Sequence, residues 1–147
     1  MTDDVKARYR RYLEQAWTAD GDRLDALVAE LVTADFVIHQ TRTDGAPSER
    51  IRGPAALTRL IRESRLLFRE VSSVIEVGPI VEGDLVAAHW RFHGTYVGGM
   101  PGATAKPGTK VQFAGIDMLR SSGDRFAEYW VVSEAMRLMA QLGIGKG

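Results

Sequence analysis

The stretch VSSVIEVGPIVEGDLVAAHWRFHGTYV, residues 71–97, decides the fold, because apolar and polar residues alternate on both sides of a turn. Alternation with a period of two indicates β-strands. The turn EGD at 82–84 separates the two runs and predicts an antiparallel hairpin. The runs TKVQFAGIDMLR (109–120) and RFAEYWVVSE (125–134) flank SSGD in the same way and predict a second hairpin.

The first third of the chain has helical periodicity instead. We expect a helix over Val5–Trp17 that ends by Gly21 and turns Tyr9, Tyr12 and Trp17 toward the sheet. Further expected elements are a helix after Asp22, a strand at 35–40, a polar loop at 41–54, a helix from Pro54 and a short helix from Ala135. Helices first and hairpins last predict one α+β domain over residues 1–147.

In this domain a curved, mostly antiparallel sheet of about four to six strands would wrap around three N-terminal helices. A sheet rolled in this way forms a conical barrel with one open end, and ligand pockets favour such concave places. The Gly- and Pro-rich segment 98–108 is expected to be mobile and to lie near the pocket entrance or a subunit boundary.

Composition excludes several classes of protein. Nineteen Lys and Arg balance nineteen Asp and Glu, which argues against nucleic-acid binding by bulk electrostatics. No apolar run is long enough to span a membrane and no leader follows Met1, so a cytoplasmic protein is expected. The absence of cysteine excludes disulfides and thiolate chemistry. Three scattered histidines do not form a zinc motif, so no metal is expected.

Polar residues on the predicted strands are candidates for chemistry. His89, Arg91 and His93 share one face of their strand, and Trp90 and Phe92 share the other. The polar face could meet solvent or a second subunit, or it could form a polar wall inside the cone. Parity alone does not decide between these placements.

Two carboxylates raise the same question. Asp117 shares its strand face with apolar residues, and Glu134 ends a strand on the same face as Trp130. If both carboxylates face one pocket, their proximity would raise one pKa and provide an acid and a base. Alternatively, Asp117 could form an ion pair with Arg91 or Arg120.

The second half of the chain resembles the SnoaL-like polyketide cyclases of the nuclear transport factor 2-like superfamily. HGTYVGGMPGATAKPGTKVQFAGIDMLR (93–120) is similar to the family's histidine-glycine strand, its Gly/Pro loop and the following strand. GDRFAEYWVVSEAMRLMAQLG (123–143) is similar to its closing pattern: Glu-His-Trp, an acidic residue four positions later, and Gln-Leu-Gly. The resemblance covers residues 5–143 and implies a conical α+β barrel with a deep pocket that needs no cofactor.

In that family the acidic residue after the Trp is usually an aspartate that acts as general acid/base in an intramolecular aldol closure. The corresponding residue here is Glu134, and the family's histidine is replaced by Tyr129. The resemblance therefore implies that Glu134 points into a pocket and transfers a proton on a hydrophobic, oxygenated, polyketide-like molecule. We expect Asp117 or His93 to tune or relay that proton and Arg91 to stabilise negative charge on oxygen. Expected substrate-binding residues are Tyr12, Trp17, His39, Phe113, Trp130 and Met136.

Two alternatives use the same residues. Asp117 and Glu134 could open an epoxide if both reach one water, or the pocket could bind a small ligand without chemistry. A homodimer is also expected, because aromatic residues on the sheet face opposite the pocket need a partner. If the polar set lines the pocket, the strands around Trp90 and Tyr129 would form that interface.

Overall fold

The structure is a computed structural model that describes residues 2–40 and 51–145. Within these residues, six strands form one open sheet in the order β2-β1-β6-β5-β4-β3. All neighbouring strands are antiparallel except β1 and β6, which are parallel. The predicted α+β class and both hairpins are confirmed. The strands are β1 Val32–Gln40, β2 Ile51–Arg52, β3 Phe68–Glu82, β4 Leu85–Tyr96, β5 Lys110–Ser122 and β6 Arg125–Ser133.

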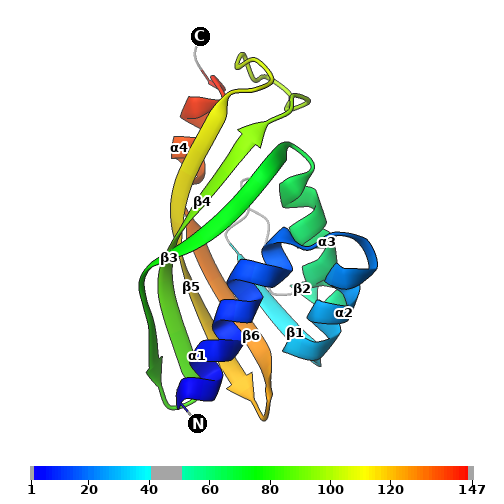
Figure 1. Ribbon diagram of the computed structural model, residues 1–147, viewed down its shortest axis with the longest axis vertical. Helices are drawn as coiled ribbons and strands as arrows, with labels where there is room; N and C mark the ends of the chain where they lie inside the picture. Colours follow the sequence, from blue (N-terminus) through cyan, green and yellow to red (C-terminus); the bar gives the residue numbers. More distant parts are fainter. Residues whose placement is uncertain (1, 41–50, 146–147) are drawn as a thin grey trace.

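The N-terminal helices cover one face of this sheet, and α4 lies at its far end near the C-terminus (Figure 1). The predicted third helix begins at Pro54, as expected, and the closing helix begins at Ala135. Most of the loop predicted at 41–54 lies outside the described residues. The helical segments are α1 Thr2–Arg10, η1 Arg11–Gln15, η2 Ala16–Thr18, α2 Gly21–Leu31, α3 Pro54–Arg65 and α4 Ala135–Gln141.

The first helix changes its geometry along its length. After α1 the backbone forms a π-helical turn, η1, and then a 3₁₀ turn, η2. Tyr9 and Tyr12 are both fully buried against the sheet, which confirms the predicted orientation of this helix. The helical segment ends at Thr18, before Gly21, in agreement with the prediction, and Gly21 begins α2 with a φ of +54°. π-Helical turns often occur at functional sites.

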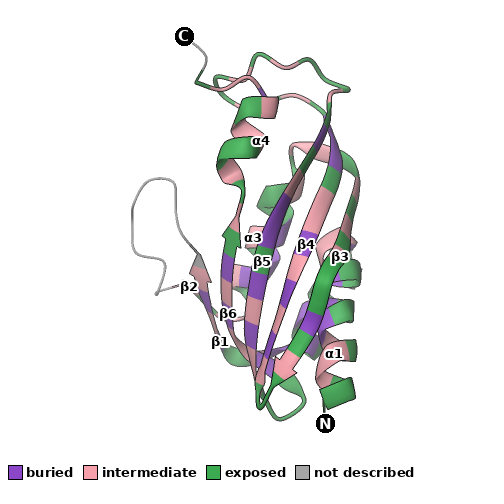
Figure 2. Cartoon of the chain, turned by 90° about the vertical axis from the view of Figure 1, so that its left-hand side faces the viewer, coloured by how far each residue is buried: buried purple, intermediate pink, exposed green. Residues whose placement is uncertain are grey.

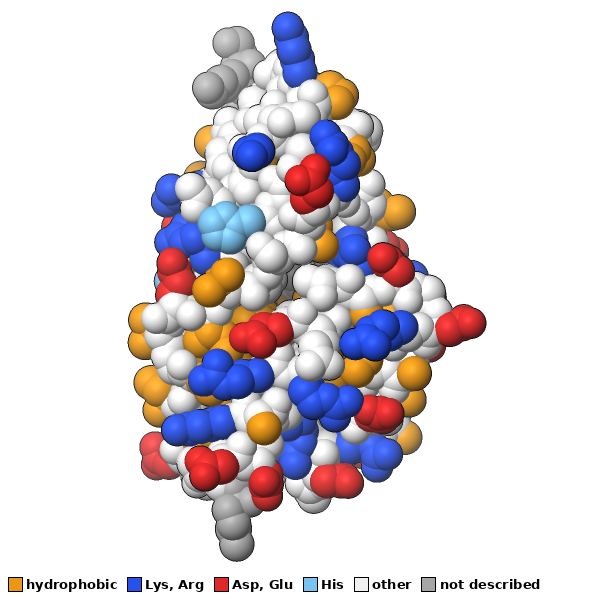
Figure 3. Space-filling view, viewed as in Figure 1, with side chains coloured by type: hydrophobic (Ala, Val, Ile, Leu, Met, Phe, Trp, Pro, Cys, Tyr) orange, Lys and Arg blue, Asp and Glu red, His pale blue; other side chains and the backbone are white. Residues whose placement is uncertain are grey.

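The core lies between these helices and the inner face of the sheet. Phe36, Ile38, Leu119 and Phe126 are fully buried there, together with the apolar stripe of α2. Figure 2 shows buried and exposed residues alternating along the strands. On the side covered by helices, Figure 3 shows cationic and anionic side chains interspersed over the surface.

The dimer prediction assumed that the polar face of β4 lines the pocket and that its aromatic face meets a partner, and the structure shows the opposite orientation. Trp90 is 8% exposed and packs into the core with Phe92, whereas His89, Arg91 and His93 lie on the outer face. Burying two aromatic side chains stabilises the fold, while burying a charged arginine without a partner would cost far more than burying an unpaired neutral polar group. Tyr96, Tyr129 and Val131 are also buried, so the predicted interface around Trp90 and Tyr129 is wrong.

The segment 98–108 packs against α4. The amides of Thr104 and Ala105 both donate to the carbonyl of Leu142, and Met100 N donates to the Tyr96 hydroxyl at 2.9 Å. Tyr96, Val111 and Leu142 form a second apolar cluster beneath this segment. The segment is thus tied to the end of the sheet and to the C-terminal helix.

Candidate active site

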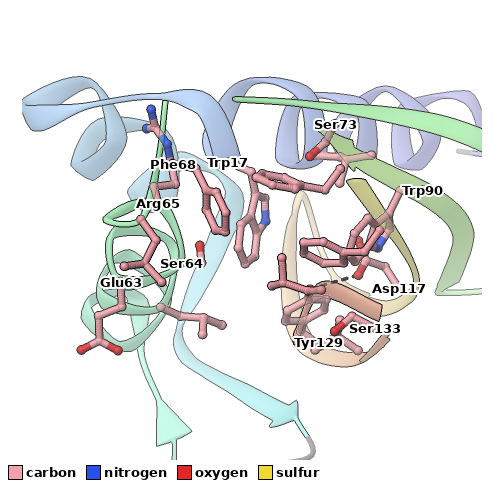
Figure 4. A pocket seen from close by; sticks show the side chains of 17 residues that line it. Trp17, Glu63, Ser64, Arg65, Phe68, Ser73, Trp90, Asp117, Tyr129 and Ser133 are labelled. Carbon is pink, nitrogen blue, oxygen red and sulfur yellow. Dashed lines mark hydrogen bonds between the residues drawn. The ribbon is translucent and has the colours of Figure 1, made fainter. Parts of the chain in front are cut away.

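A partly open cavity of about 220 Å³ lies between the helices and the inner face of the sheet. Figure 4 shows side chains converging on it from both layers. None of its described lining residues belongs to 98–108, but this segment packs in one apolar cluster with Leu67, Phe68 and Leu138, which do line the cavity. The lining residues include Leu13, Trp17, Arg65, Phe68, Trp90, Phe92, Phe113, Asp117, Tyr129, Val131 and Ser133.

Asp117 is the buried carboxylate of this cavity, with 1% of its surface exposed. Its two oxygens each accept a hydrogen bond from a tyrosine hydroxyl. Tyr9 donates to Oδ2 at 2.9 Å, and Tyr129 donates to Oδ1 at 3.0 Å. Asp117 forms no ion pair with Arg91 or Arg120, because Arg91 binds Glu76 and Arg120 binds Asp84 and Glu128. The carboxylate is therefore held by neutral donors alone.

Burial raises the pKa of Asp117 from 3.8 to about 6, because desolvation disfavours the charged form. The indole of Trp90 and the hydroxyls of Tyr9 and Tyr129 act in the opposite direction. Trp90 Nε1 is buried and has no acceptor at hydrogen-bond geometry, so it acts on the carboxylate as a nearby dipole. Tyr9 and Tyr129 have strongly raised pKa values, chiefly through burial, and remain protonated donors at neutral pH.

Trp90 reaches its position because Gly115 lies opposite it on β5. A Cβ atom at Gly115 would lie 2.3 Å from Cζ2 of Trp90, so only glycine leaves room for the ring there. The indole then lies edge-on to Phe113, with ring centroids 5.9 Å apart, and the ring centroids of Phe113 and Phe92 are 5.1 Å apart. This aromatic wall gives the cavity a predominantly apolar surface around the buried carboxylate of Asp117, while the second lining carboxylate, Glu63, is exposed.

The π-helical turn brings Tyr12 behind the same site. Its ring lies edge-on to Tyr129 at 5.4 Å and to Trp17 at 6.3 Å. The Tyr12 hydroxyl interacts electrostatically with Tyr129 and Trp17, but neither it nor Trp17 Nε1 has a partner at hydrogen-bond geometry. Of the predicted substrate-binding residues, Trp17 and Phe113 line the cavity, whereas Tyr12 lies one layer behind it.

Glu134 does not point into this cavity, so that expectation is corrected. It shares a strand face with Val132, which is 69% exposed on the outside of the sheet. Glu134 Oε1 accepts a hydrogen bond from Ala114 N at 2.8 Å, and Glu134 N donates to Ala114 O. The carboxylate thus satisfies a backbone amide where β6 ends. Asp117 and Glu134 lie on opposite faces, and the predicted carboxylate pair does not form.

The other predicted polar residues also lie outside. Arg91 Nε donates to Glu76 at 2.9 Å, and His89 Nδ1 lies 3.3 Å from the same carboxylate. His93 is exposed on the same face. Together with Glu134, His89 and Arg91 line a shallow hollow of about 280 Å³ on the outer face.

Three predicted substrate-binding residues are similarly remote from the cavity. The rings of His39 and Trp130 stack at 5.3 Å on the outer face, and His39 Nε2 lies 2.8 Å from Glu128. Met136 is 85% exposed on α4. None of these three belongs to the described residues that line the cavity.

Sequence reasoning missed the roles of Tyr9 and Trp90. Tyr9 was recognised as inward-facing, but its bond to Asp117 spans 108 residues and leaves no local pattern. The inward orientation of Trp90 and Asp117 could have been predicted from the sequence. Both would lie on the inner face if the aromatic side of β4 is taken as the core side, as burial of large apolar area favours.

The comparison with family models matches residues 7–142 to the SnoaL-like polyketide cyclases. The chain belongs to this family. Its members' fold, that of nuclear transport factor 2, agrees with the helix-covered open sheet described above. A search of curated proteins finds no match.

Solved structures of candidate polyketide cyclases and of a candidate hydroxylase resemble the chain along nearly its whole length. IdmH of Streptomyces antibioticus, described as a candidate polyketide cyclase, is 22% identical with a TM-score of 0.73, and the match covers 97% of this chain and 98% of IdmH. A candidate SnoaL-like polyketide cyclase from Jannaschia sp. CCS1 is 18% identical with a TM-score of 0.78, covering 98% and 94%. AclR of Streptomyces galilaeus, a candidate hydroxylase, is 18% identical with a TM-score of 0.66, covering 97% and 92%. These likenesses establish the fold.

Two further searches of the described residues gave negative results. No group of His, Asp and Glu side chains among them is arranged to hold a metal ion. No helix in the described part of the chain is long and apolar enough to cross a membrane.

Proposed function

We propose that this SnoaL-like protein is a cofactor-independent cyclase-type enzyme in which Asp117 is the general base and acid. The observation that carries the proposal is a 1% exposed carboxylate at the wall of an aromatic cavity, held by two tyrosine hydroxyls. Family membership supports a cyclase-type role. This assignment gives Asp117 the part that the resemblance implied for Glu134.

The reaction is an intramolecular aldol closure of a hydrophobic, oxygenated, polyketide-like molecule. Asp117 removes a proton from a carbon next to a carbonyl, and the electron pair of the C–H bond forms an enolate. The enolate carbon attacks a second carbonyl of the same molecule, forming a C–C bond and an alkoxide. Asp117 then returns its proton to the alkoxide, so the protein ends the cycle unchanged.

The environment of Asp117 suits both halves of this cycle. A pKa of about 6 leaves the carboxyl mostly ionised at pH 7, yet basic enough to hold the proton between the two steps. The apolar wall of Phe92, Phe113 and Trp90 excludes water, which strengthens the electrostatic interactions of the carboxylate. Trp17 and Phe113 are proposed to contact the substrate.

The direct test uses substrate analogues with two carbonyls placed for ring closure, such as aryl-substituted 1,5-diketones, which close to six-membered rings, with products separated by mass spectrometry. Asp117→Asn should lower turnover by roughly 10²- to 10⁴-fold, the usual contribution of a general base. Glu134→Gln is the matched control, because Glu134 lies on the outer face. Normal turnover by Asp117→Asn, or an equal loss in Glu134→Gln, would reject the assignment.

The alternative in which the cavity only binds a ligand predicts a different outcome of this experiment. Analogues would then bind to wild type and to Asp117→Asn without conversion by either protein. The epoxide-opening alternative required Asp117 and Glu134 to reach one water. Since the two carboxylates lie on opposite faces, that condition is not met.

A homodimer remains part of the proposal, with the outer face of the sheet as its interface. Ile116 and Val132 are register partners on β5 and β6 and are 54% and 69% exposed. Val74 on β3 is 50% exposed on the same sheet. Exposed apolar side chains on this face favour association, and two-fold symmetry is the commonest form for soluble oligomers.

A further inference from the structure

The two tyrosines that bind Asp117 occupy different positions relative to the cavity. Tyr129 lines the cavity wall, whereas Tyr9, on α1, is fully buried and does not line it. A ligand entering the cavity can therefore approach Oδ1 and the Tyr129 hydroxyl. The bond from Tyr9 to Oδ2 lies behind the wall, where a ligand does not compete for it.

Among the described residues, Asp117 has no charged hydrogen-bond partner in addition to these two hydroxyls. The groups that act on Asp117 are Tyr9 from α1, Tyr129 from β6 and Trp90 from β4, with Tyr12 from η1 also close enough to interact. A carboxylate in such surroundings becomes protonated unless hydrogen bonds favour the charged form. Of the two full hydrogen bonds, only the one from Tyr9 is out of reach of a ligand.

We propose that Tyr9 is a positioning residue for proton transfer: it anchors Asp117 Oδ2 from behind the cavity wall, keeps the carboxylate ionised, and leaves Oδ1 turned toward the ligand. The first helix is then part of the catalytic apparatus and not only a cover for the sheet. This inference rests on the proposed function of Asp117.

Tyr12 provides a matched control for Tyr9. Both tyrosines are 0% exposed in the same N-terminal helical segment, and their ring centroids are 6.2 Å apart. Only Tyr9 donates to Asp117, since the Tyr12 hydroxyl has no partner at hydrogen-bond geometry. Replacing either residue with phenylalanine removes one buried hydroxyl and keeps the ring. The two variants therefore separate the loss of this bond from general loosening of the core.

The experiment is a pH titration of the Asp117 carboxyl by ¹³C NMR in protein labelled at aspartate Cγ, with Asp117→Asn used to assign the resonance. No substrate is needed. Loss of one hydrogen bond to the charged form should increase the proton affinity of Asp117 roughly tenfold in Tyr9→Phe, while Tyr12→Phe should change it less than about twofold. An unchanged titration in Tyr9→Phe, or an equal shift in both variants, would overturn the proposal.

A second substitution covers the case in which Tyr9→Phe does not fold. Incorporation of 3-fluorotyrosine at position 9 keeps the ring and makes the hydroxyl a stronger donor, so it should lower the proton affinity of Asp117. The same substitution at position 12 should leave it unchanged. The titration is independent of turnover. A shift without catalysis would refute the proposed function alone, and catalysis that needs Asp117 without a shift would refute the role of Tyr9 alone.

Discussion

The Tyr129 hydroxyl donates a 3.0 Å hydrogen bond to Asp117, although the residue opposite Tyr129 in the sheet is Leu119. The bond is therefore a diagonal contact between inward-facing side chains of β5 and β6. It places a carboxylate in the wall of a largely apolar cavity, without an ion-pair partner among the described residues. Burial of this group is unfavourable for stability and has measurable consequences at equilibrium.

The first prediction concerns stability and pH. The pKa of Asp117 is about 6 in the folded protein and 3.8 without burial, so between these values the folded state binds more protons than the unfolded state. The contribution of Asp117 to stability therefore falls as pH rises from about 4 to 6, by roughly 3 kcal/mol in total. The Asp117→Asn variant has no carboxyl that ionises at this position, so it does not lose this stability as the pH rises.

Urea denaturation at pH 4.5 and pH 7.5 measures this effect. The stability of Asp117→Asn relative to wild type should be higher at pH 7.5 than at pH 4.5, because only the wild type has to keep a charge buried at the higher pH. A relative stability that does not depend on pH would contradict the buried, titrating carboxylate. Other titrating groups cancel in this comparison because both proteins share them.

A second prediction concerns the pH dependence of catalysis. Because Asp117 must be ionised to accept a proton, the rate should rise with pH through about 6 and level off above it. Rates measured from pH 4.5 to 8 on one analogue should show this single limb. A rate that falls over the same range would instead indicate a protonated Asp117 as the active form.

Gly115 carries the third prediction. An alanine there would place its Cβ 2.3 Å from the Trp90 ring, and overpacking of this kind typically costs about 1–3 kcal/mol. We expect Gly115→Ala to destabilise the protein by this amount in thermal or urea unfolding. In a Trp90→Phe background the smaller ring should remove most of the penalty. An equal penalty in both backgrounds would show that Trp90 is not the residue that requires glycine.

The helices, hairpins and fold class could be predicted from the sequence because periodicity and turn residues are local properties. The two faces of β4 and β6 were also separated correctly: Trp130 and Glu134 do share one face with Glu128. What parity could not supply was which face points inward, since His89 and Arg91 are compatible with either solvent or a wet pocket. In the structure Trp90 is buried, so the aromatic face of β4 points inward and the face with His89, Arg91 and His93 points outward.

The site was harder to predict because its contacts are non-local. Asp117 was a candidate from its apolar neighbours, but its partners Tyr9 and Tyr129 come from opposite ends of the chain. The motif position of Glu134 was misleading for a local reason. Its carboxylate binds the amide of Ala114 at the end of β6, and this contact directs the side chain away from the cavity.

The fourth prediction tests the homodimer. The double variant Ile116→Glu with Val132→Glu places charge on paired positions of the outer face and should yield monomers in sedimentation velocity at micromolar concentration. Leu66→Glu is the control, because Leu66 is 73% exposed at the end of α3 and away from the sheet surface. A monomeric wild type would exclude this assembly. A double variant that stays dimeric would place the interface elsewhere.

The most direct test of the central claim is hydrogen–deuterium exchange into the carbon next to the carbonyl of 2-tetralone, followed by NMR in D₂O. This apolar ketone needs only the first step, removal of a proton by a general base. We predict that wild type and Glu134→Gln accelerate exchange equally, and that Asp117→Asn reduces the acceleration at least a hundredfold. Exchange that survives in Asp117→Asn, or that depends on Glu134, would contradict the assignment of Asp117 as the base.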